Sequence, residues 1–172
     1  MALSEDNQRN IVLAEQLKEE GTRLFRENNY QAALAKYARI FLYVNGLVSS
    51  SSDMAKYSRA NVMDADTEAR VTELKHSILM NQAMCLIKMN EPSRAIIKCD
   101  QAIVIKRTAR ALYRRGQALL QSGNLRRARD DFLEGKGLEP ENAAFDEMLA
   151  KVDREEERAD RALAKGLKGM FV

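Results

Sequence analysis

The sequence predicts an all-α protein made of three helix-turn-helix units and a long C-terminal helix. Proline is almost absent, with 2 in 172 residues, and the helix-favouring residues Ala, Leu, Lys, Glu and Arg are abundant. Apolar residues recur at spacings of three and four, which is typical of amphipathic helices rather than strands. The same order of small and large residues also returns along the chain, which indicates a repeat architecture.

The first unit is expected over residues 10–44, after a polar tail over residues 1–9. Apolar residues from Ile11 to Phe25 mark one face of a helix. The polar turn Glu27–Asn29 interrupts the pattern, and a second helix follows from Tyr30 to Val44. The unit therefore reads as two helices joined by a tight turn.

An insertion separates the first unit from the second. Residues 45–65 include the serine-rich run NGLVSSSSDMAKYS, which has no helical pattern and predicts a loop. Asp64 or Asp66 is expected to cap the helix that follows. The run contains Ser49–Ser52, and its role is left open.

The second unit is expected over residues 66–106 and the third over residues 107–140. In the second, the turn Asn90–Glu91 is followed by Pro92, a residue favoured at the first position of a helix. In the third, Ser122–Asn124 forms the turn between two helices. Both units repeat the helix-turn-helix pattern of the first.

Residues 141–172 are expected to form a capping helix and a tail. The helix is predicted from about Ala143 to Lys165, with apolar residues along one side. Gly166 and Gly169 disfavour a helix beyond that point. The tail is both basic and apolar, which leaves open a secondary contact with a partner protein. Its residues include Leu163, Leu167, Lys168, Met170 and Phe171.

The three units share a spacing of small and large residues. A small residue in each first helix lies twelve residues before an alanine in the second helix, and a larger residue follows four positions later. Small residues let two helices approach closely, and the larger residue fills the space between neighbouring pairs. The sets are Gly21, Ala33 and Tyr37; Ala83, Ala95 and Cys99; and Gly116, Ala128 and Phe132.

The composition argues against an enzyme and against a metal or cofactor site. Cys85, Cys99 and the single His76 supply neither a zinc ligand set nor a disulfide framework. We expect both cysteines to be packing residues and His76 to lie at the surface or an interface. No catalytic motif is present, and no stretch is apolar enough to insert into a membrane. These features lead us to expect a cytoplasmic protein.

The segment from Ala102 to Arg129 is locally basic, although the net charge of the chain is only +3. It can add positive potential to a groove, form an ordinary solvated surface or contact a phosphate backbone. Tyr113 is its one aromatic residue, so base stacking is poorly supported and nucleic acid is not the expected partner. Its basic residues are Lys106, Arg107, Arg110, Arg114, Arg115, Arg126, Arg127 and Arg129.

The third unit resembles a tetratricopeptide repeat (TPR). Its sequence LYRRGQALLQSGNLRRARDDFLEGKGLEP matches the L-x3-G, A-x3-F and final P pattern. LKEEGTRLFRENNYQAALAKY and ILMNQAMCLIKMNEPSRAIIKCDQAI match the first and middle repeats. The whole arrangement resembles the TPR domain of large FKBP-type immunophilins and related co-chaperones. The resemblance implies a right-handed superhelix with a groove for peptides or proteins, and it implies no isomerase activity because it covers only the repeats.

In chaperone-binding members of this family, a carboxylate clamp holds the C-terminal Asp of heat-shock protein 90 or 70. The resemblance implies that this chain binds the same partners. Lys and Arg form strong charge-assisted hydrogen bonds with carboxylates, and residues four apart on a helix share a face. The positions that match the clamp are Lys18 and Thr22, Asn81, and Arg110 and Arg114.

Two clamp positions depart from the family pattern. Thr22 stands where the family has Asn and offers one donor instead of two, a loss of about 1 kcal/mol. Arg110 replaces a Lys, which keeps the charge but changes its shape. Phe25, Met84 and Tyr113 are candidates for pockets that hold apolar side chains of the peptide.

One alternative is a scaffold whose groove binds an internal segment of a non-chaperone assembly partner. In that case a free terminal carboxylate would not matter for binding. The sequence does not predict the oligomeric state.

Overall fold

The computed structural model describes residues 4–47 and 62–170, with side chains described as far as Gly166. The helices within these ranges confirm the all-α class. They are α1 (Glu5–Arg26), α2 (Tyr30–Val44), α3 (Ala65–Lys88), α4 (Pro92–Ile105), α5 (Ala109–Gln121), α6 (Leu125–Leu138) and α7 (Ala144–Met170).

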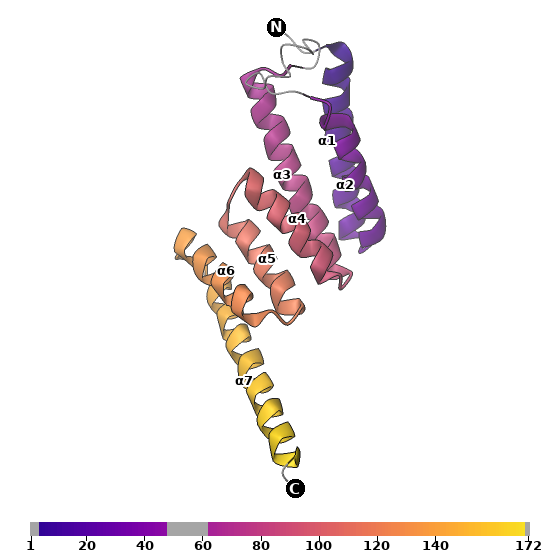
Figure 1. Ribbon diagram of the computed structural model, residues 1–172. Coiled ribbons are helices and arrows are strands. Elements are labelled where there is room, and N and C mark those ends of the chain that lie inside the picture. Colours follow the sequence, from indigo (N-terminus) through magenta and orange to yellow (C-terminus); the bar gives the residue numbers. More distant parts are fainter. Residues whose placement is uncertain (1–3, 48–61, 171–172) are drawn as a thin grey trace.

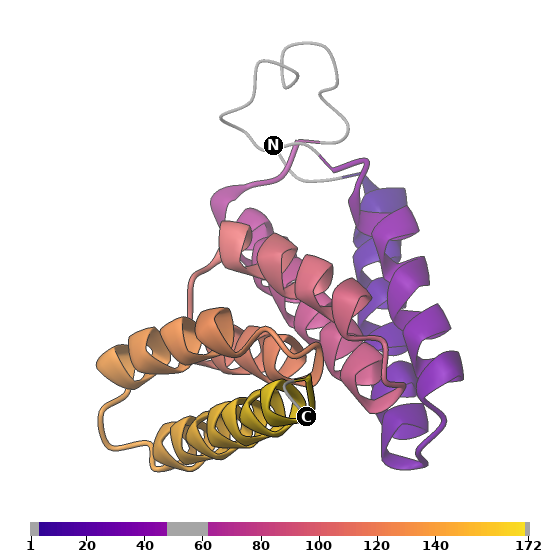
Figure 2. The ribbon, with the colours of Figure 1, turned by 60° about the horizontal axis from the view of Figure 1, so that its bottom comes forward.

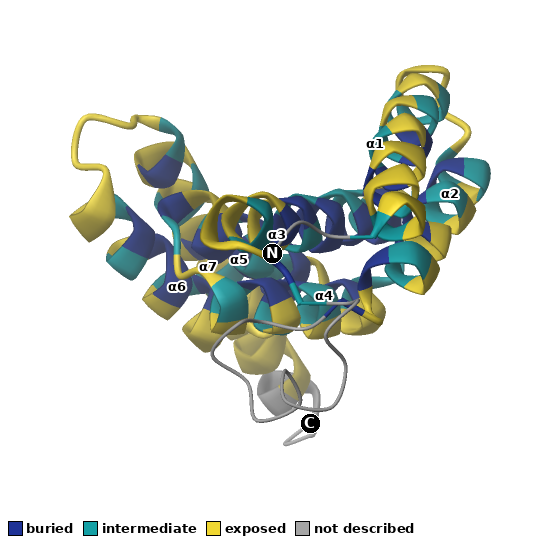
Figure 3. Ribbon diagram, turned by 90° about the horizontal axis from the view of Figure 1, so that it is seen from above, coloured by how far each residue is buried: buried dark blue, intermediate teal, exposed yellow. Residues whose placement is uncertain are grey.

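The helices stack as consecutive pairs, in the order of the sequence (Figure 1). α1 packs on α2, α3 on α4 and α5 on α6, and each second helix also packs on the next first helix. α3 contacts both α1 and α5, so the first helices form one side of the stack. α7 packs on α6 and α5 and extends beyond the rest of the stack (Figures 1 and 2). From above, the stack forms an arc with α1 and α2 at one end and α6 at the other (Figure 3).

The same type of turn joins the two helices of each pair. Asn28, Asn90 and Gly123 have φ angles of 60°, 59° and 77°, a left-handed conformation in which Asn and Gly are favoured. In each turn the next N–H bonds back to a carbonyl five residues earlier, as in a Schellman motif. These bonds run from Asn29 to Leu24, from Glu91 to Leu86 and from Asn124 to Leu119.

Side chains cap most of the helix N-termini. Asp64, one of the two predicted caps of α3, accepts a hydrogen bond from the Thr67 N–H at 2.8 Å. Ser4 caps α1, so the first helix begins at Glu5, inside the segment predicted as a polar tail. α4 has no side-chain cap and begins with Pro92.

Close approach at glycine holds the pairs together. A Cβ atom added to Gly21 would lie 2.6 Å from the Tyr37 ring, and one added to Gly116 would lie 2.5 Å from Phe132. Both aromatic rings are buried. The predicted close approach of the two helices at the small residue is thus confirmed at both positions, and the structure adds that the larger residue packs on the glycine within its own pair. The structure adds a further case, in which the Phe145 ring of α7 packs on Gly135 of α6.

Cys85 and Cys99 are fully buried, as expected of packing residues. Burial raises the pKa of the Cys85 thiol to about 11 and that of Cys99 to about 12. Both thiols therefore stay protonated near neutral pH.

Two expectations concern the ends of the predicted segments. The expected end of α7 near Lys165 is wrong, because the helix continues through Gly166 and Gly169 to Met170. Most of the predicted insertion, residues 48–61 with Ser49–Ser52, lies outside the described residues.

Candidate peptide-binding site

Three of the five predicted clamp residues line one cavity of about 650 Å³. α1 contributes Lys18, α3 contributes Asn81 and α5 contributes Arg110. The three side chains are brought together because α3 packs between α1 and α5. Lys18 and Asn81 are half-buried and Arg110 is exposed, so the polar groups are open to a ligand.

Arg114 lies one turn after Arg110 on α5, and 8% of its surface is exposed. Its Nη1 donates a hydrogen bond of 2.5 Å to the Met80 carbonyl of α3. Among the described residues, no carboxylate forms an ion pair with Arg114. Burial lowers the pKa of Arg114 to about 10, and the positive charge of Arg110 acts in the same direction. A buried cation without a counter-charge favours an anionic ligand.

Thr22 uses its hydroxyl within the protein. The Oγ1 atom donates to the Lys18 carbonyl at 2.8 Å and lies 3.3 Å from the Tyr37 hydroxyl. A hydroxyl has one proton to donate. In this arrangement Thr22 can accept a hydrogen bond from a ligand but has no proton left to donate to one. The sequence predicts a donor at this position.

Tyr37 connects Thr22 to Asn81. Burial raises the pKa of the Tyr37 phenol, and its hydrogen bonds with Thr22 and Asn81 oppose this shift. Thr22 belongs to α1, Tyr37 to α2 and Asn81 to α3, so the three polar groups link three helices next to the cavity.

Tyr113 lies beside the cavity in an aromatic cluster. Its ring makes edge contacts with Phe132 at 5.9 Å and with Phe145 at 5.5 Å between centroids. Tyr113 and Arg110 also line a smaller cavity of about 370 Å³. Arg110 therefore separates a polar cavity from one with aromatic walls.

Phe25 and Met84, the other two candidates for pockets that hold apolar side chains, lie on α1 and α3. Phe25 is half-buried, and its ring packs against Tyr30 at a centroid distance of 5.2 Å. Met84 is half-buried three residues after Asn81, on the same face of α3. Phe25 thus contributes to packing between α1 and α2.

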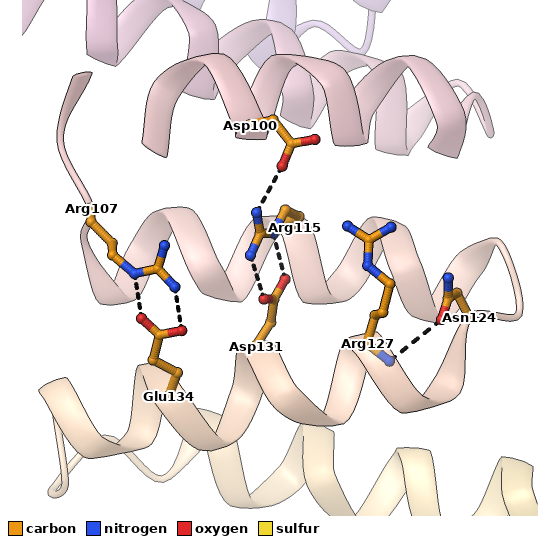
Figure 4. A network of polar contacts seen from close by, with 7 residues as sticks. All are labelled: Asp100, Arg107, Arg115, Asn124, Arg127, Asp131 and Glu134. Atoms are coloured by element: carbon orange, nitrogen blue, oxygen red, sulfur yellow. Dashed lines mark hydrogen bonds and ion pairs between the residues drawn. The ribbon is translucent and has the colours of Figure 1, made fainter. Parts of the chain in front are cut away.

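Arg115, on the opposite side of α5 from the cavity, is the centre of an ion-pair network (Figure 4). Its guanidinium bonds both oxygens of Asp131 on α6, at 2.8 and 2.7 Å, and bonds Asp100 of α4 at 2.7 Å. The hydrogen bond with Asp131 is the main cause of the raised pKa of Arg115. Arg107 forms a similar two-pronged pair with Glu134.

The basic residues of the Ala102–Arg129 segment fall into two groups, those with an ion pair and those without. Lys106, Arg107, Arg115 and Arg129 are paired with carboxylates from α3, α4, α6 and α7. Within the described part of the chain, the basic residues of this segment without an ion pair are Arg110, Arg114, Arg126 and Arg127. The segment is therefore less basic than its sequence suggests.

The Arg115–Asp131 pair is not among the predictions from the sequence, although the sequence holds a signal for it. The two residues are 16 positions apart, and so are Glu20 and Lys36, which pair at 2.6 Å. Gly116 and Phe132 have the same separation. An offset of 16 therefore marks residues that face each other across a helix pair.

His76, which the sequence places at the surface or an interface, is instead buried. Only 7% of its surface is exposed, and it lines the same cavity as Lys18 and Arg110. Its Nε2 atom is covered and has no hydrogen-bond partner among the described residues. Burial lowers the pKa of His76, whereas Glu73 opposes that shift.

A second cavity of about 650 Å³ lies between the C-terminal end of α5 and α7. Leu120, Leu125 and Met148 give it apolar walls, and Gln117 and Arg158 are among its polar residues. Sequence analysis did not anticipate it, because its lining residues come from distant parts of the chain.

None of the helices within the described residues has the length and apolar character needed to cross a membrane. Nor do His, Cys, Asp and Glu residues in this part of the chain form a group of three or more able to hold a metal ion.

Comparison with known proteins gave one sequence relative of particular interest. The human peptidyl-prolyl cis-trans isomerase FKBP4 is 31% identical over 150 residues, a match that covers 87% of this chain. The chain spans only 29% of the length of FKBP4. No protein-family model matches the chain.

Solved structures share the fold at low sequence identity. The C-terminal TPR-containing domain of an FK506-binding protein from Plasmodium falciparum has a TM-score of 0.73 at 20% identity, over 90% of this chain and 95% of that one. The Hsp90 co-chaperone Cns1 from Saccharomyces cerevisiae gives 0.73 at 20%, over 93% and 44%. The second TPR domain of human RPAP3, in complex with the HSP70 peptide SGPTIEEVD, gives 0.63 at 23%, over 84% and 98%. The chain is therefore a tetratricopeptide-repeat domain that resembles the TPR region of FKBP-type immunophilins.

Proposed function

We propose that this chain is a co-chaperone-like adaptor that binds the acidic C-terminal peptide of heat-shock protein 90 or 70. The cavity lined by Lys18, Asn81 and Arg110 is the proposed site for the terminal Asp. One observation carries the proposal. Arg110 and Arg114 have no ion pair among the described residues, whereas Arg107 and Arg115 on either side of them do.

The chemistry of the cavity suits a terminal Asp, which presents two carboxylates. Lys18 and Arg110 supply charge-assisted donors from opposite walls, and the Asn81 amide supplies a directional one. Arg114 is held by the Met80 carbonyl, and with a pKa of about 10 it is charged at neutral pH. It adds positive potential without itself moving.

The rest of the peptide has a path along α5. Arg110, Arg114, Gln117 and Gln121 share one helix face, because they are spaced by four, three and four residues. The distance from the first to the last is about 17 Å along the helix, which about five extended residues span. Gln117 and Gln121 line the second cavity, where Met148 forms part of an apolar wall. An apolar side chain near the start of the peptide can occupy that cavity.

The structural relatives support this class of ligand. The RPAP3 domain is solved with an HSP70 peptide that ends in Glu-Glu-Val-Asp, and Cns1 is an Hsp90 co-chaperone. The buried, unpaired thiols of Cys85 and Cys99 suit a reducing compartment. We therefore propose a binding role in the cytoplasm, without catalysis by this domain.

The second cavity favours one alternative function. Its apolar walls, formed by residues such as Leu120 and Met148, can bind a side chain from the interior of a protein segment. A scaffold of this kind would bind its assembly partner without a free carboxylate.

The proposal can be tested by replacing Arg110 with Ala. Arg110 is exposed, so its removal should leave the fold intact, whereas removal of Arg114 would also leave the Met80 carbonyl unpaired. The ligand is the HSP90 peptide SRMEEVD, and affinity is measured by calorimetry. Arg110→Ala should bind at least about tenfold more weakly, the expected cost of losing a charged hydrogen bond.

Arg127→Ala is the matched control. Arg127 is also exposed and without an ion pair among the described residues, but it lies on α6 away from the cavity. Its variant should bind the peptide as the wild type does. Equal binding by all three proteins would rule out the proposed site.

A further inference from the structure

His76 is the chain's single histidine, and its position next to the proposed site gives it a role beyond packing. One ring nitrogen interacts with the Lys106 backbone, while Nε2 has no hydrogen-bond partner among the described residues. In either neutral tautomer, Nε2 is therefore a buried polar atom without a partner among the described residues. Such an atom is unfavourable in the free protein, so a bound group that improved its surroundings would be favoured.

The surroundings of His76 favour its neutral form in the free protein. Burial lowers its pKa, and the positive charges of Lys106 and Arg110 act in the same direction. Glu73 opposes them, but its carboxylate also pairs with Lys106 at 3.4 Å. The charged groups that line the cavity are Glu15 and Lys18 from α1, Arg70 and Glu73 from α3, Lys106 from the α4–α5 connection, and Arg110 from α5.

We propose that His76 is a binding residue for the acidic peptide: a ligand carboxylate in the cavity draws one proton from solvent onto the His76 imidazole, so that binding and protonation are coupled. The inference rests on the proposed function of this cavity. A carboxylate beside Arg110 offsets the positive charge there and attracts an imidazolium directly. In the free site the acidic groups of the cavity, Glu15 and Glu73, are shared with Arg70 and Lys106, so a ligand carboxylate adds a counter-charge to the one that Glu73 already supplies.

The sign of the effect follows from linkage. If the bound peptide raises the pKa of His76, the complex holds more protons than its separate parts, and affinity rises as the pH falls. A rise of one pKa unit strengthens binding by up to about tenfold. The peptide carboxylates titrate near pH 4, so they remain charged over most of the range from about pH 5.5 to 7.5.

The test is calorimetry with the peptide SRMEEVD at about pH 5.5, 6.5 and 7.5, on protein without a histidine tag. Wild-type affinity should rise at least about threefold from the highest to the lowest pH. His76→Gln removes the titrating ring but keeps every other charged group of the cavity, and its affinity should not vary with pH. Arg127→Ala should retain the wild-type pH dependence.

NMR provides a readout that needs no variant. The single histidine gives one set of imidazole signals, so its pKa can be titrated with and without saturating peptide. The pKa should be higher in the complex. An unchanged pKa, or a pH dependence that persists in His76→Gln, would overturn the coupling while leaving the proposed function intact. If the peptide binds at no pH, the proposed function fails and this inference fails with it.

Discussion

The hydrogen bonds of Thr22 show what its residue type could not, namely that its hydroxyl is engaged within the protein. The side chain lies at a proposed clamp position, but its proton is donated to the Lys18 carbonyl of the preceding helical turn. Threonine commonly bonds back to the backbone in this way, since the carbonyl four residues earlier is within reach. Sequence could identify the position but not this competing partner.

Thr22→Asn should strengthen binding of SRMEEVD. An amide has two protons to donate. One added hydrogen bond of about 1 kcal/mol corresponds to a roughly fivefold gain in affinity. Calorimetry at neutral pH measures the effect. Thr22→Val is the control, because it removes a hydroxyl that donates within the protein, and its affinity should match that of the wild type. A large loss in Thr22→Val would show that the hydroxyl serves the ligand.

His76 should also make the free protein less stable at mildly acidic pH. Its pKa is lowered by burial, so the unfolded chain binds the proton more readily than the folded one. This contribution to stability is present above about pH 6.5 and is lost as the pH falls through the folded pKa. Urea unfolding should give a free energy lower by up to about 1 kcal/mol at pH 5.5 than at pH 7.5.

His76→Gln serves as the control for this stability measurement. The carboxyls of Glu20 and Glu134 have pKa values lowered by their ion pairs from an ordinary 4.5, so they stay charged across this range. The variant should therefore unfold with the same free energy at both pH values. A wild-type stability that does not change would contradict the buried position of the ring.

At the scale of helices, the repeat was predictable because its signals are local. The turn residues Asn28, Asn90 and Gly123 and the paired small and large residues occur at fixed spacings in the sequence. The contact between Gly135 and Phe145 breaks that spacing, since α7 follows α6 through a different connection. Sequence periodicity therefore could not reveal it. Helix propensity also predicted too early an end for α7, because Gly166 and Gly169 disfavour a helix yet lie within this one.

Two glycines of α6 provide a test of this packing. Gly135→Ala would push a methyl group into the Phe145 ring and should destabilise the protein by about 1–3 kcal/mol. Gly137→Ala meets no atom within 4 Å and should stabilise the helix by about 0.5–1 kcal/mol. Thermal unfolding of the two variants measures the difference. Equal effects of the two changes would contradict the close packing of α7 on α6.

At the scale of the whole molecule, ion pairs determine where positive charge remains available. The formal charge of the Ala102–Arg129 segment is visible in the sequence, but the partners of Arg115 come from two other helices. Arg110 and Arg114 remain unpaired among the described residues, on the side of α5 that carries the cavity. Only the assembled stack shows this separation, because it depends on which helices face each other.

This charge distribution argues against nucleic-acid binding. A surface that binds phosphate needs several free cations, but Arg107, Arg115 and Arg129 are paired with carboxylates. Of the basic residues of the segment without an ion pair among the described residues, Arg110 and Arg114 lie on the cavity side of α5, which leaves Arg126 and Arg127. The protein should therefore give no mobility shift with RNA or DNA oligonucleotides at low salt. Binding that weakens steeply with salt, and that is lost in an Arg126→Ala, Arg127→Ala double variant, would contradict this expectation.

The most direct test of the central claim compares SRMEEVD with the same peptide amidated at its C-terminus. Calorimetry at neutral pH gives both affinities under identical conditions. The proposed site predicts micromolar binding of the acid and binding of the amide at least about tenfold weaker, because in that proposal Lys18, Asn81 and Arg110 hold the terminal carboxylates. Equal binding of the two peptides would favour recognition of an internal segment instead, and binding of neither would exclude the chaperone C-terminus as the ligand.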